Sequence, residues 1–212
     1  MGVWGPLIAV AGLLGAVVGM LVDGRNAVSI ASVVVALGLA PTVAATTGPP
    51  ATLVLIGAAA LAFALGWASR RAAQRLPWVA GLDPLIPAFA RQRRLFGSRS
   101  VRVWAAGLAV PVASWVGFNI SIGEVAAVQG VLFPVAYVWA CGGLRILVAR
   151  TVEDLAVGGV MVALAASAAW FVRGGSALYS GAAAFALLAA LAAVVAGWLS
   201  GRHSRREAAG RA

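Results

Sequence analysis

The sequence contains no lysine, a single cysteine (Cys141) and a single histidine (His203) among its 212 residues. One cysteine excludes an internal disulfide bond and a cysteine-based metal cluster. One histidine excludes haem ligation by a histidine pair, and the absence of lysine excludes a retinal Schiff base. Charged residues make up 10% of the chain, whereas a soluble domain carries roughly 25%. These shortages exclude most soluble folds and several classes of membrane cofactor.

Ionisable side chains are also missing from the middle of the long apolar runs. Proton pumps and ion carriers place such groups at that depth, so neither activity is favoured. Asp23, Glu153 and Asp154 lie beside apolar runs, but they do not form the acidic cluster with which a lipid-phosphate transferase would hold a divalent metal. No Walker, Rossmann or zinc motif is present. We therefore expect no catalytic activity, no metal and no cofactor.

Apolar residues dominate what is present: 62% of the chain is hydrophobic, and the mean hydropathy is +0.98. These values predict an all-α integral membrane protein with several transmembrane helices. The formal charge of +10 could indicate nucleic-acid binding, but no soluble basic module is visible, so we expect no nucleic-acid partner. Residues 1–22 lack a basic segment before their apolar run, which argues against a cleaved signal peptide. Arginine without lysine, with abundant alanine, glycine and valine, is typical of a GC-rich bacterial genome.

The charged residues divide the chain into its apolar runs. The longest uncharged run, 26–69, has 44 residues. As one helix it would be about 66 Å long, roughly twice the hydrocarbon thickness of a bilayer. Thr46-Thr47-Gly48-Pro49-Pro50 therefore marks a hairpin turn. The sequence predicts seven transmembrane helices, or six if one weak segment is re-entrant: 1–22, 28–45, 51–68, 103–123, 125–144, 155–172 and 177–199.

The arginines predict how these helices are oriented. If the segment 69–102 is cytoplasmic, fifteen of the sixteen arginines are cytoplasmic and only Arg173 is not. Loops rich in arginine stay in the cytoplasm, so we expect an outer N-terminus and an inner C-terminus in a bacterial cytoplasmic membrane. The predicted organisation is 1–68 (three spans), 69–102 (basic cytoplasmic connector), 103–199 (four spans) and 200–212 (basic cytoplasmic tail).

The connector 69–102 has a pattern of its own. Asp83-Pro84 resembles a helix N-cap followed by proline at the first helical position, and apolar and basic residues then fall on different faces. Such an amphipathic helix lies at the inner membrane interface and contacts anionic headgroups or an acidic partner. Alternatively, the arginines serve only to hold the flanking helices in place. The candidate contact residues are Arg91, Arg93, Arg94, Arg99 and Arg102.

A polar cluster is predicted at the outer turn between the spans 103–123 and 125–144. A carboxylate at the mouth of a helix bundle can bind a cation or a solute amine. The alternative is that the carboxylate belongs to an ordinary exposed loop. The cluster comprises Asn119, Ser121, Glu124 and Gln129.

Small residues and a short repeated pattern bear on helix packing. The glycines of Gly15-Ala16-Val17-Val18-Gly19 share one helix face, which suits close contact with another helix. The sequences from Gly66 to Arg70 and from Gly197 to Arg202 both begin Gly-Trp and continue to serine and arginine. This match indicates either a parallel three-helix repeat, as found in some transporters, or ordinary interfacial anchoring.

The segment from Thr151 to Asp154 predicts the start of a helix. A threonine followed three residues later by an acid is a capping-box pattern, and acids favour a helix N-terminus. The acids of this segment are also expected to be able to pair with Arg145 or Arg150.

The sequence leaves more than one function open. Our first hypothesis is a non-catalytic accessory, scaffold or assembly subunit of a larger bacterial membrane complex, with other membrane subunits as partners. The alternative is a small transporter or channel for an uncharged or weakly charged solute. A third hypothesis is a lipid-interacting protein that uses residues 78–102. The transporter pathway would be lined by polar residues and by helices kinked at proline: Asn119, Gln129, Tyr137, Pro41, Pro111 and Pro134.

Overall fold

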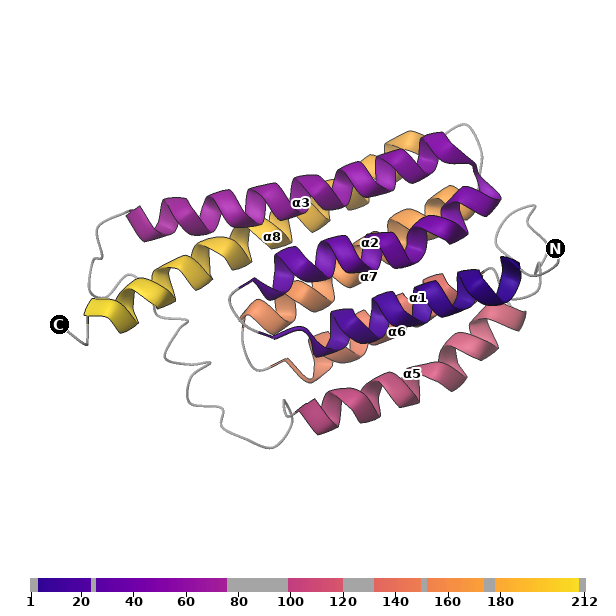
Figure 1. Cartoon of the computed structure of the whole chain (residues 1–212), viewed down its shortest axis with the longest axis horizontal. Coiled ribbons are helices and arrows are strands. Elements are labelled where there is room, and N and C mark those ends of the chain that lie inside the picture. Colours follow the sequence, from indigo (N-terminus) through magenta and orange to yellow (C-terminus); the bar gives the residue numbers. More distant parts are fainter. Residues whose placement is uncertain are drawn as a thin grey trace.

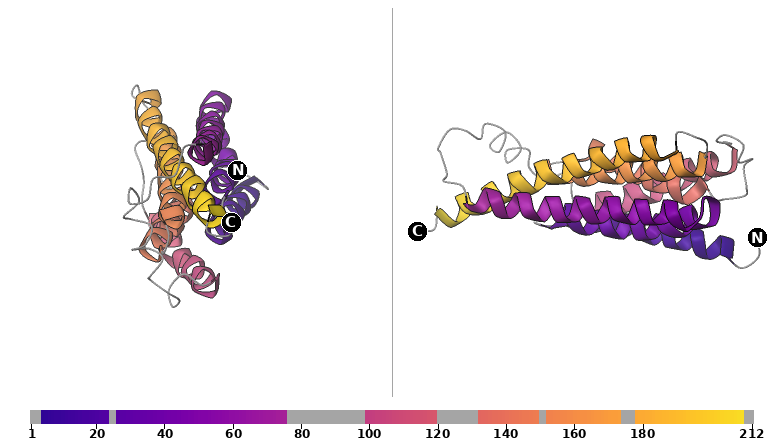
Figure 2. Two further views of the ribbon diagram at one scale, coloured as in Figure 1. Left: turned by 90° about the vertical axis from the view of Figure 1, so that its left-hand side faces the viewer. Right: turned by 90° about the horizontal axis from the view of Figure 1, so that it is seen from above.

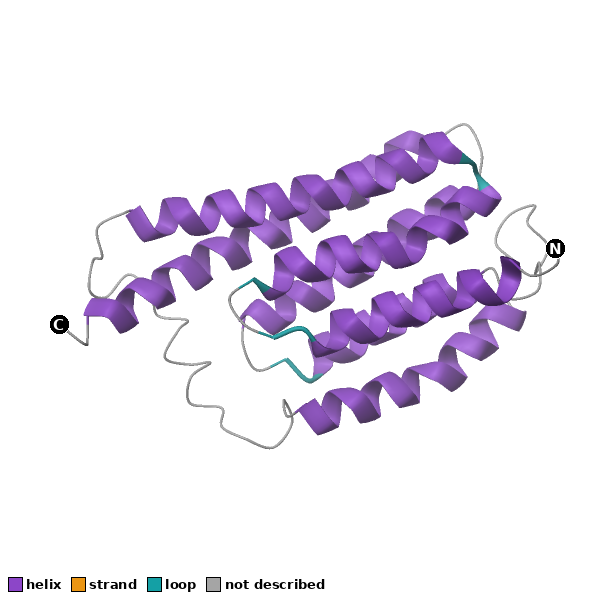
Figure 3. Ribbon diagram, in the orientation of Figure 1, coloured by secondary structure: helices purple, strands orange, loops and turns teal. Residues whose placement is uncertain are grey.

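The computed structural model describes residues 4–23, 26–75, 99–119, 132–149, 152–173 and 178–209. Within these ranges the regular structure is entirely α-helical (Figure 3). Five of the helices, α2, α3, α5, α7 and α8, are long and apolar enough to cross a membrane, and α1 and α6 are shorter apolar helices. The described helices are thus those expected of a helical membrane protein. The helices are α1 (Trp4–Leu21), α2 (Ala27–Thr46), α3 (Pro49–Arg75), α5 (Arg99–Asn119), α6 (Leu132–Leu147), α7 (Val152–Arg173) and α8 (Leu178–Ala209).

The predicted hairpin in the long apolar run is confirmed. Helix α2 ends at Thr46, and α3 begins at Pro49 after a turn of two residues. Gly48 has a φ of 95°, a left-handed conformation that glycine adopts without steric cost. Proline suits the first position of α3, because the N–H group that it lacks would have no partner there.

Two helices extend seven residues or more beyond their predicted ends. Helix α3 continues past 68 to Arg75, and α8 continues past 199 to Ala209. Most residues of these extensions are alanine, arginine and glutamine or glutamate, which are strong helix formers. Parts of the predicted connector and tail are thus helical.

Six of the helices form two layers of three. Helices α1, α2 and α3 make one layer, and α6, α7 and α8 make the other (Figures 1 and 2). Across the layers α1 packs on α6, α2 on α7 and α3 on α8. Consecutive helices alternate in direction, so each of these facing pairs runs the same way (Figure 1). Helix α5 lies at one edge, against α6 and α1.

Glycines allow the helix backbones to approach closely. A Cβ atom on Gly38 of α2 would lie 2.9 Å from the carbonyl oxygen of Ala11 in α1. A Cβ atom on Gly158 of α7 would lie 2.8 Å from the carbonyl oxygen of Gly142 in α6. Gly15 packs against Gly38, so the small face predicted on the first helix is used within the chain.

The described arginines separate along the bundle as the sequence predicts. The C-terminal ends of α1, α3, α6 and α8 and the N-terminal ends of α2, α5 and α7 lie together, at the left in Figure 1. We call this the basic end, because every described arginine except Arg173 lies there. Arg173 is the last residue of α7 and lies at the opposite end.

Candidate functional site

The largest fully buried side chain in the described part of the molecule is an arginine. Arg145, near the end of α6, is 1% exposed. Its guanidinium donates hydrogen bonds to the carbonyl oxygen of Gly19, to that of Met20 at 2.9 Å and to that of Val22 at 2.8 Å. It also donates to Oδ1 of Asp154 at 3.0 Å. One side chain therefore joins α6 to the end of α1 and to the start of α7.

The local structure explains why a cation is stable at this position. The last carbonyl groups of α1 have no partner within their own helix, and a positive charge interacts favourably with the C-terminal end of a helix dipole. Asp154 lies in the first turn of α7, where a negative charge is favourable for the same reason. Burial of the arginine is thus offset by hydrogen bonds and by an opposite charge.

A second buried arginine lies close to Asp154 and belongs to the same group of charges. Arg102 of α5 is 6% exposed and pairs with Asp23, which follows α1. Its guanidinium also lies 3.7 Å from Oδ1 of Asp154. We call Asp23, Arg102, Arg145 and Asp154 the arginine network. It contains two positive and two negative charges, and it connects α1, α5, α6 and α7 at the basic end.

The predicted pairing of Asp154 with Arg145 is confirmed. Glu153 and Asp154 lie in the first turn of α7, as the capping-box pattern predicts for acids at a helix start. Thr151 and Arg150 lie outside the described residues.

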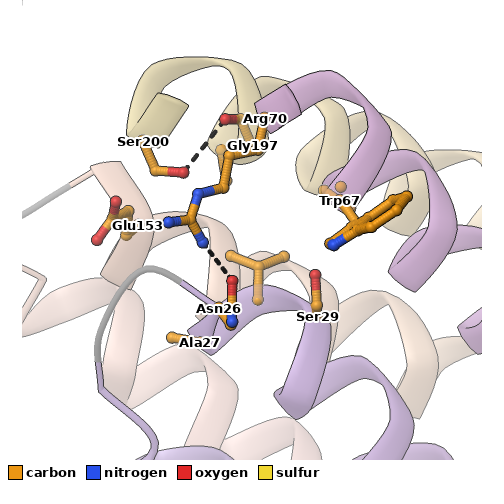
Figure 4. A pocket seen from close by; sticks show the side chains of 12 residues that line it. Asn26, Ala27, Ser29, Trp67, Arg70, Glu153, Gly197 and Ser200 are labelled. Carbon is orange, nitrogen blue, oxygen red and sulfur yellow. Dashed lines mark hydrogen bonds between the residues drawn. The ribbon is translucent and has the colours of Figure 1, made fainter. Parts of the chain in front are cut away.

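A polar crevice lies between α2, α3, α7 and α8 at the basic end (Figure 4). The Arg70 guanidinium donates a hydrogen bond to Asn26, and the Ser200 hydroxyl donates to the carbonyl oxygen of Gly197 at 3.2 Å. Trp67 and Glu153 also line the crevice. Its volume is about 10 Å³, which is about the space of one water molecule. The crevice therefore suits a bridging water rather than an organic ligand.

The repeated Gly-Trp pattern lies at the crossing of α3 and α8. A Cβ atom on Gly197 would meet the carbonyl oxygen of Gly66, and one on Gly66 would lie 3.3 Å from the carbonyl oxygen of Ala193. The two glycines thus bring the two backbones together. Each tryptophan carries an arginine over its ring: Arg71 is 3.8 Å from the Trp67 centroid and Arg202 is 4.7 Å from that of Trp198.

A larger hollow opens toward the opposite end. It has a volume of about 400 Å³ and is lined by residues of α5, α6, α7 and α8. Nearly all of its lining is apolar, with Arg173 at one margin. We call it the lateral groove.

Most of the predicted contact residues lie outside the described part of the chain. This is true of Arg91, Arg93, Arg94, Ser121, Glu124, Gln129 and the Asp83-Pro84 helix start. Arg99 is the first residue of α5. The lipid-contact and outer-cluster hypotheses therefore stay predictions.

Two residues of the predicted connector contacts and outer cluster have side chains that the structure describes. Arg102 is buried and paired within the chain, so its charge serves the arginine network. Asn119 is exposed at the end of α5, and its amide donates a hydrogen bond to the carbonyl oxygen of Trp115 at 3.0 Å.

The prolines predicted to lie inside spans have different settings. Pro41 and Pro111 lie inside α2 and α5. Pro134 lies in the first turn of α6, where the missing N–H group has no intrahelical partner to lose. Tyr137 is buried, and its hydroxyl donates to the carbonyl oxygen of Ala106 in α5 at 3.0 Å. It thus joins α6 to α5.

No protein-family model, curated protein or solved structure matches this chain.

Proposed function

We propose that this protein is a non-catalytic subunit of a larger membrane complex, with an accessory, scaffold or assembly role. The observation that carries the proposal is the setting of α5. Among the described helices, α5 alone has no counterpart in the opposite layer (Figure 1). An edge helix of this kind offers a surface to a neighbouring membrane protein.

The outer face of α5 carries large apolar side chains. Trp104 is 75% exposed, Leu108 is 64% exposed and Trp115 is 63% exposed. Their spacing of four and seven residues places them along one face of the helix. Tryptophan is enriched among the residues that dominate binding energy at protein interfaces. We call these three residues the α5 face.

The arginine network supports a scaffolding role. Its carboxylates and guanidinium groups bond to one another and to backbone carbonyl groups. These charges join four helices at the basic end. Such contacts favour a rigid helix bundle on which other subunits can assemble.

The test is co-purification of the tagged chain in mild detergent, followed by identification of stoichiometric partners. Replacement of Trp104, Leu108 and Trp115 by alanine is expected to reduce recovery of the partner at least tenfold, as expected for interface residues that dominate binding. The matched control replaces Leu187, Leu188 and Leu191 of α8, which are 67%, 55% and 60% exposed. The control is expected to keep the partner. A chain that purifies alone, as a monomer or homodimer, would rule out the proposal.

A second candidate function is a transporter for an uncharged or weakly charged solute. The observation in its favour is that the two three-helix layers pair helix by helix and in the same direction, as parallel repeats do in some transporters. Solute flux into liposomes that contain the purified chain alone would favour this function over the first. Flux would have to depend on the protein and saturate with solute.

We further propose seven spans, with the basic end in the cytoplasm of a bacterium. The separation of the described arginines along the bundle supports this orientation. Periplasmic and cytoplasmic reporters can be fused at Gly48, Gly81, Gly123 and Gly175. We expect Gly81 to report the cytoplasm and the other three sites to report the periplasm. A periplasmic signal at Gly81 would reverse the assignment.

A further inference from the structure

The lateral groove lies in the half of the bundle that is farther from the arginine network. Leu132, the first residue of α6, lines it, as does Arg173, the last residue of α7. Val112 and Val116 of α5 and Phe185 of α8 complete its margins. With a volume of about 400 Å³, the groove falls within the range of about 300–1,000 Å³ that is typical of ligand sites.

Small side chains create the hollow. Ala165, Ala166 and Ala169 form part of its lining on α7, where larger residues would fill the space. Aromatic rings of Trp139, Trp170 and Phe185 also line it, and the rings of Trp170 and Phe185 lie 6.4 Å apart. This combination of an apolar hollow and aromatic walls suits a hydrocarbon chain better than a polar solute.

Arg173 gives the groove a charged margin. Its side chain is exposed, and its guanidinium carbon lies 5.4 Å from the centroid of the Trp170 ring. It is also the one described arginine at this end of the bundle. A cation beside an apolar hollow complements a molecule with an anionic head and a hydrocarbon tail. An arginine guanidinium matches the geometry of a phosphate especially well.

We propose that the lateral groove binds one anionic phospholipid, with an acyl chain in the hollow and the lipid phosphate on Arg173. The lipid would fill the space left by the alanines and supply the counter-ion for Arg173. This site is separate from the α5 face and from the predicted connector contacts, so it does not depend on the proposed subunit role.

Native mass spectrometry of the purified chain tests the proposal with two lipids that have identical acyl chains, phosphatidylglycerol and phosphatidylcholine. We expect one phosphatidylglycerol to be retained in preference to phosphatidylcholine. Arg173→Gln removes the charge-assisted contact and is expected to weaken phosphatidylglycerol binding about tenfold. The matched control is Arg71→Gln, because Arg71 also lies over a tryptophan ring but does not line the groove.

A second variant tests the hydrocarbon part of the site. Ala169→Phe places a ring in the groove and is expected to abolish retention of the lipid. Ala60→Phe is its control, because Ala60 is exposed on α3 and lies outside the groove. Equal retention of the two lipids would overturn the proposal, and so would unchanged phosphatidylglycerol retention in Arg173→Gln. A cross-linker placed at Ala136, which lines the groove, gives a further check. Recovery of a stoichiometric protein on that cross-linker would also overturn the proposal. If Ala169→Phe does not fold, the Arg173→Gln comparison decides the question.

Discussion

The two ends of the bundle hold their helices together in different ways. At the basic end, Arg102 and Arg145 are buried and paired with Asp23 and Asp154, and four helices meet in one network. At the opposite end, the hydroxyl of Thr47 donates to the carbonyl oxygen of Phe171 at 2.8 Å, and the lateral groove is lined by residues of four helices. The basic end is thus joined by ion pairs and hydrogen bonds of buried arginine side chains, whereas the groove at the opposite end has a mostly apolar lining. The groove at the opposite end is where we propose that a lipid binds.

The largest effect on stability is expected from the removal of Arg145 at the basic end. Arg145→Met removes the donor to the last carbonyl groups of α1 and the nearest charge partner that Asp154 has in the arginine network. We expect the free energy of unfolding to fall by about 3–5 kcal/mol, as when one partner of a buried ion pair is removed. Thermal unfolding in detergent, followed by circular dichroism, measures the change.

Two further variants make the Arg145 test specific. Arg145→Met combined with Asp154→Asn should recover part of the loss, because it leaves one arginine and one aspartate, Arg102 and Asp23, in the network. Arg71→Met, on the exposed surface, should change stability little. A loss for Arg145→Met no larger than that for Arg71→Met would show that the network does not hold the basic end together.

A smaller effect is expected at the crossing of α3 and α8. Gly197→Ala directs a methyl group at the backbone carbonyl of Gly66, and a backbone atom cannot move aside cheaply. We expect a loss of about 1–3 kcal/mol, as for other overpacked sites. Gly57→Ala is the matched control, since a Cβ atom there meets nothing within 4 Å. The same unfolding assay applies, and equal stability of the two variants would contradict the close approach.

The smallest effect is expected at the opposite end. Thr47→Val removes the hydrogen bond between α2 and α7 while keeping the shape of the side chain. We expect a loss of about 0.5–1.5 kcal/mol. Thr52→Val removes a hydrogen bond to the carbonyl oxygen of Gly48 within the first turn of α3. It serves as a control for the loss of a hydrogen bond that joins no two helices. If Thr47→Val cost as much as Arg145→Met, the proposed difference between the two ends would be wrong.

Several features could be predicted from local sequence patterns. The turn at Gly48 follows from glycine and proline at the middle of a run that is too long for one helix. The separation of Arg173 from the other described arginines follows from the alternation of charged and apolar segments. The small face at Gly15 predicts a close helix contact. Each of these signals involves residues close together in the chain.

The candidate sites were less predictable because they join distant residues. Arg102 and Asp23 are 79 residues apart, and no motif indicates that they pair. The sequence placed Arg102 with the connector, whereas its side chain is buried against α1 and α7. The lateral groove depends on where alanines of α7 face the side chains of α5, α6 and α8, and helix spacing alone does not specify which faces meet.

The sequence by itself determined that the helices are apolar enough for a lipid environment, and it determined their order along the chain. Several of its apolar runs are long enough to span a bilayer, and the charges and turn residues between them separate one helix from the next. Only the tertiary structure decided that α1, α2 and α3 face α6, α7 and α8, that Arg145 is buried and that a groove opens near Arg173. Helix formation depends on hydrogen bonds between residues four apart in sequence, whereas these features depend on side-chain packing and ion pairs between helices that are distant in sequence.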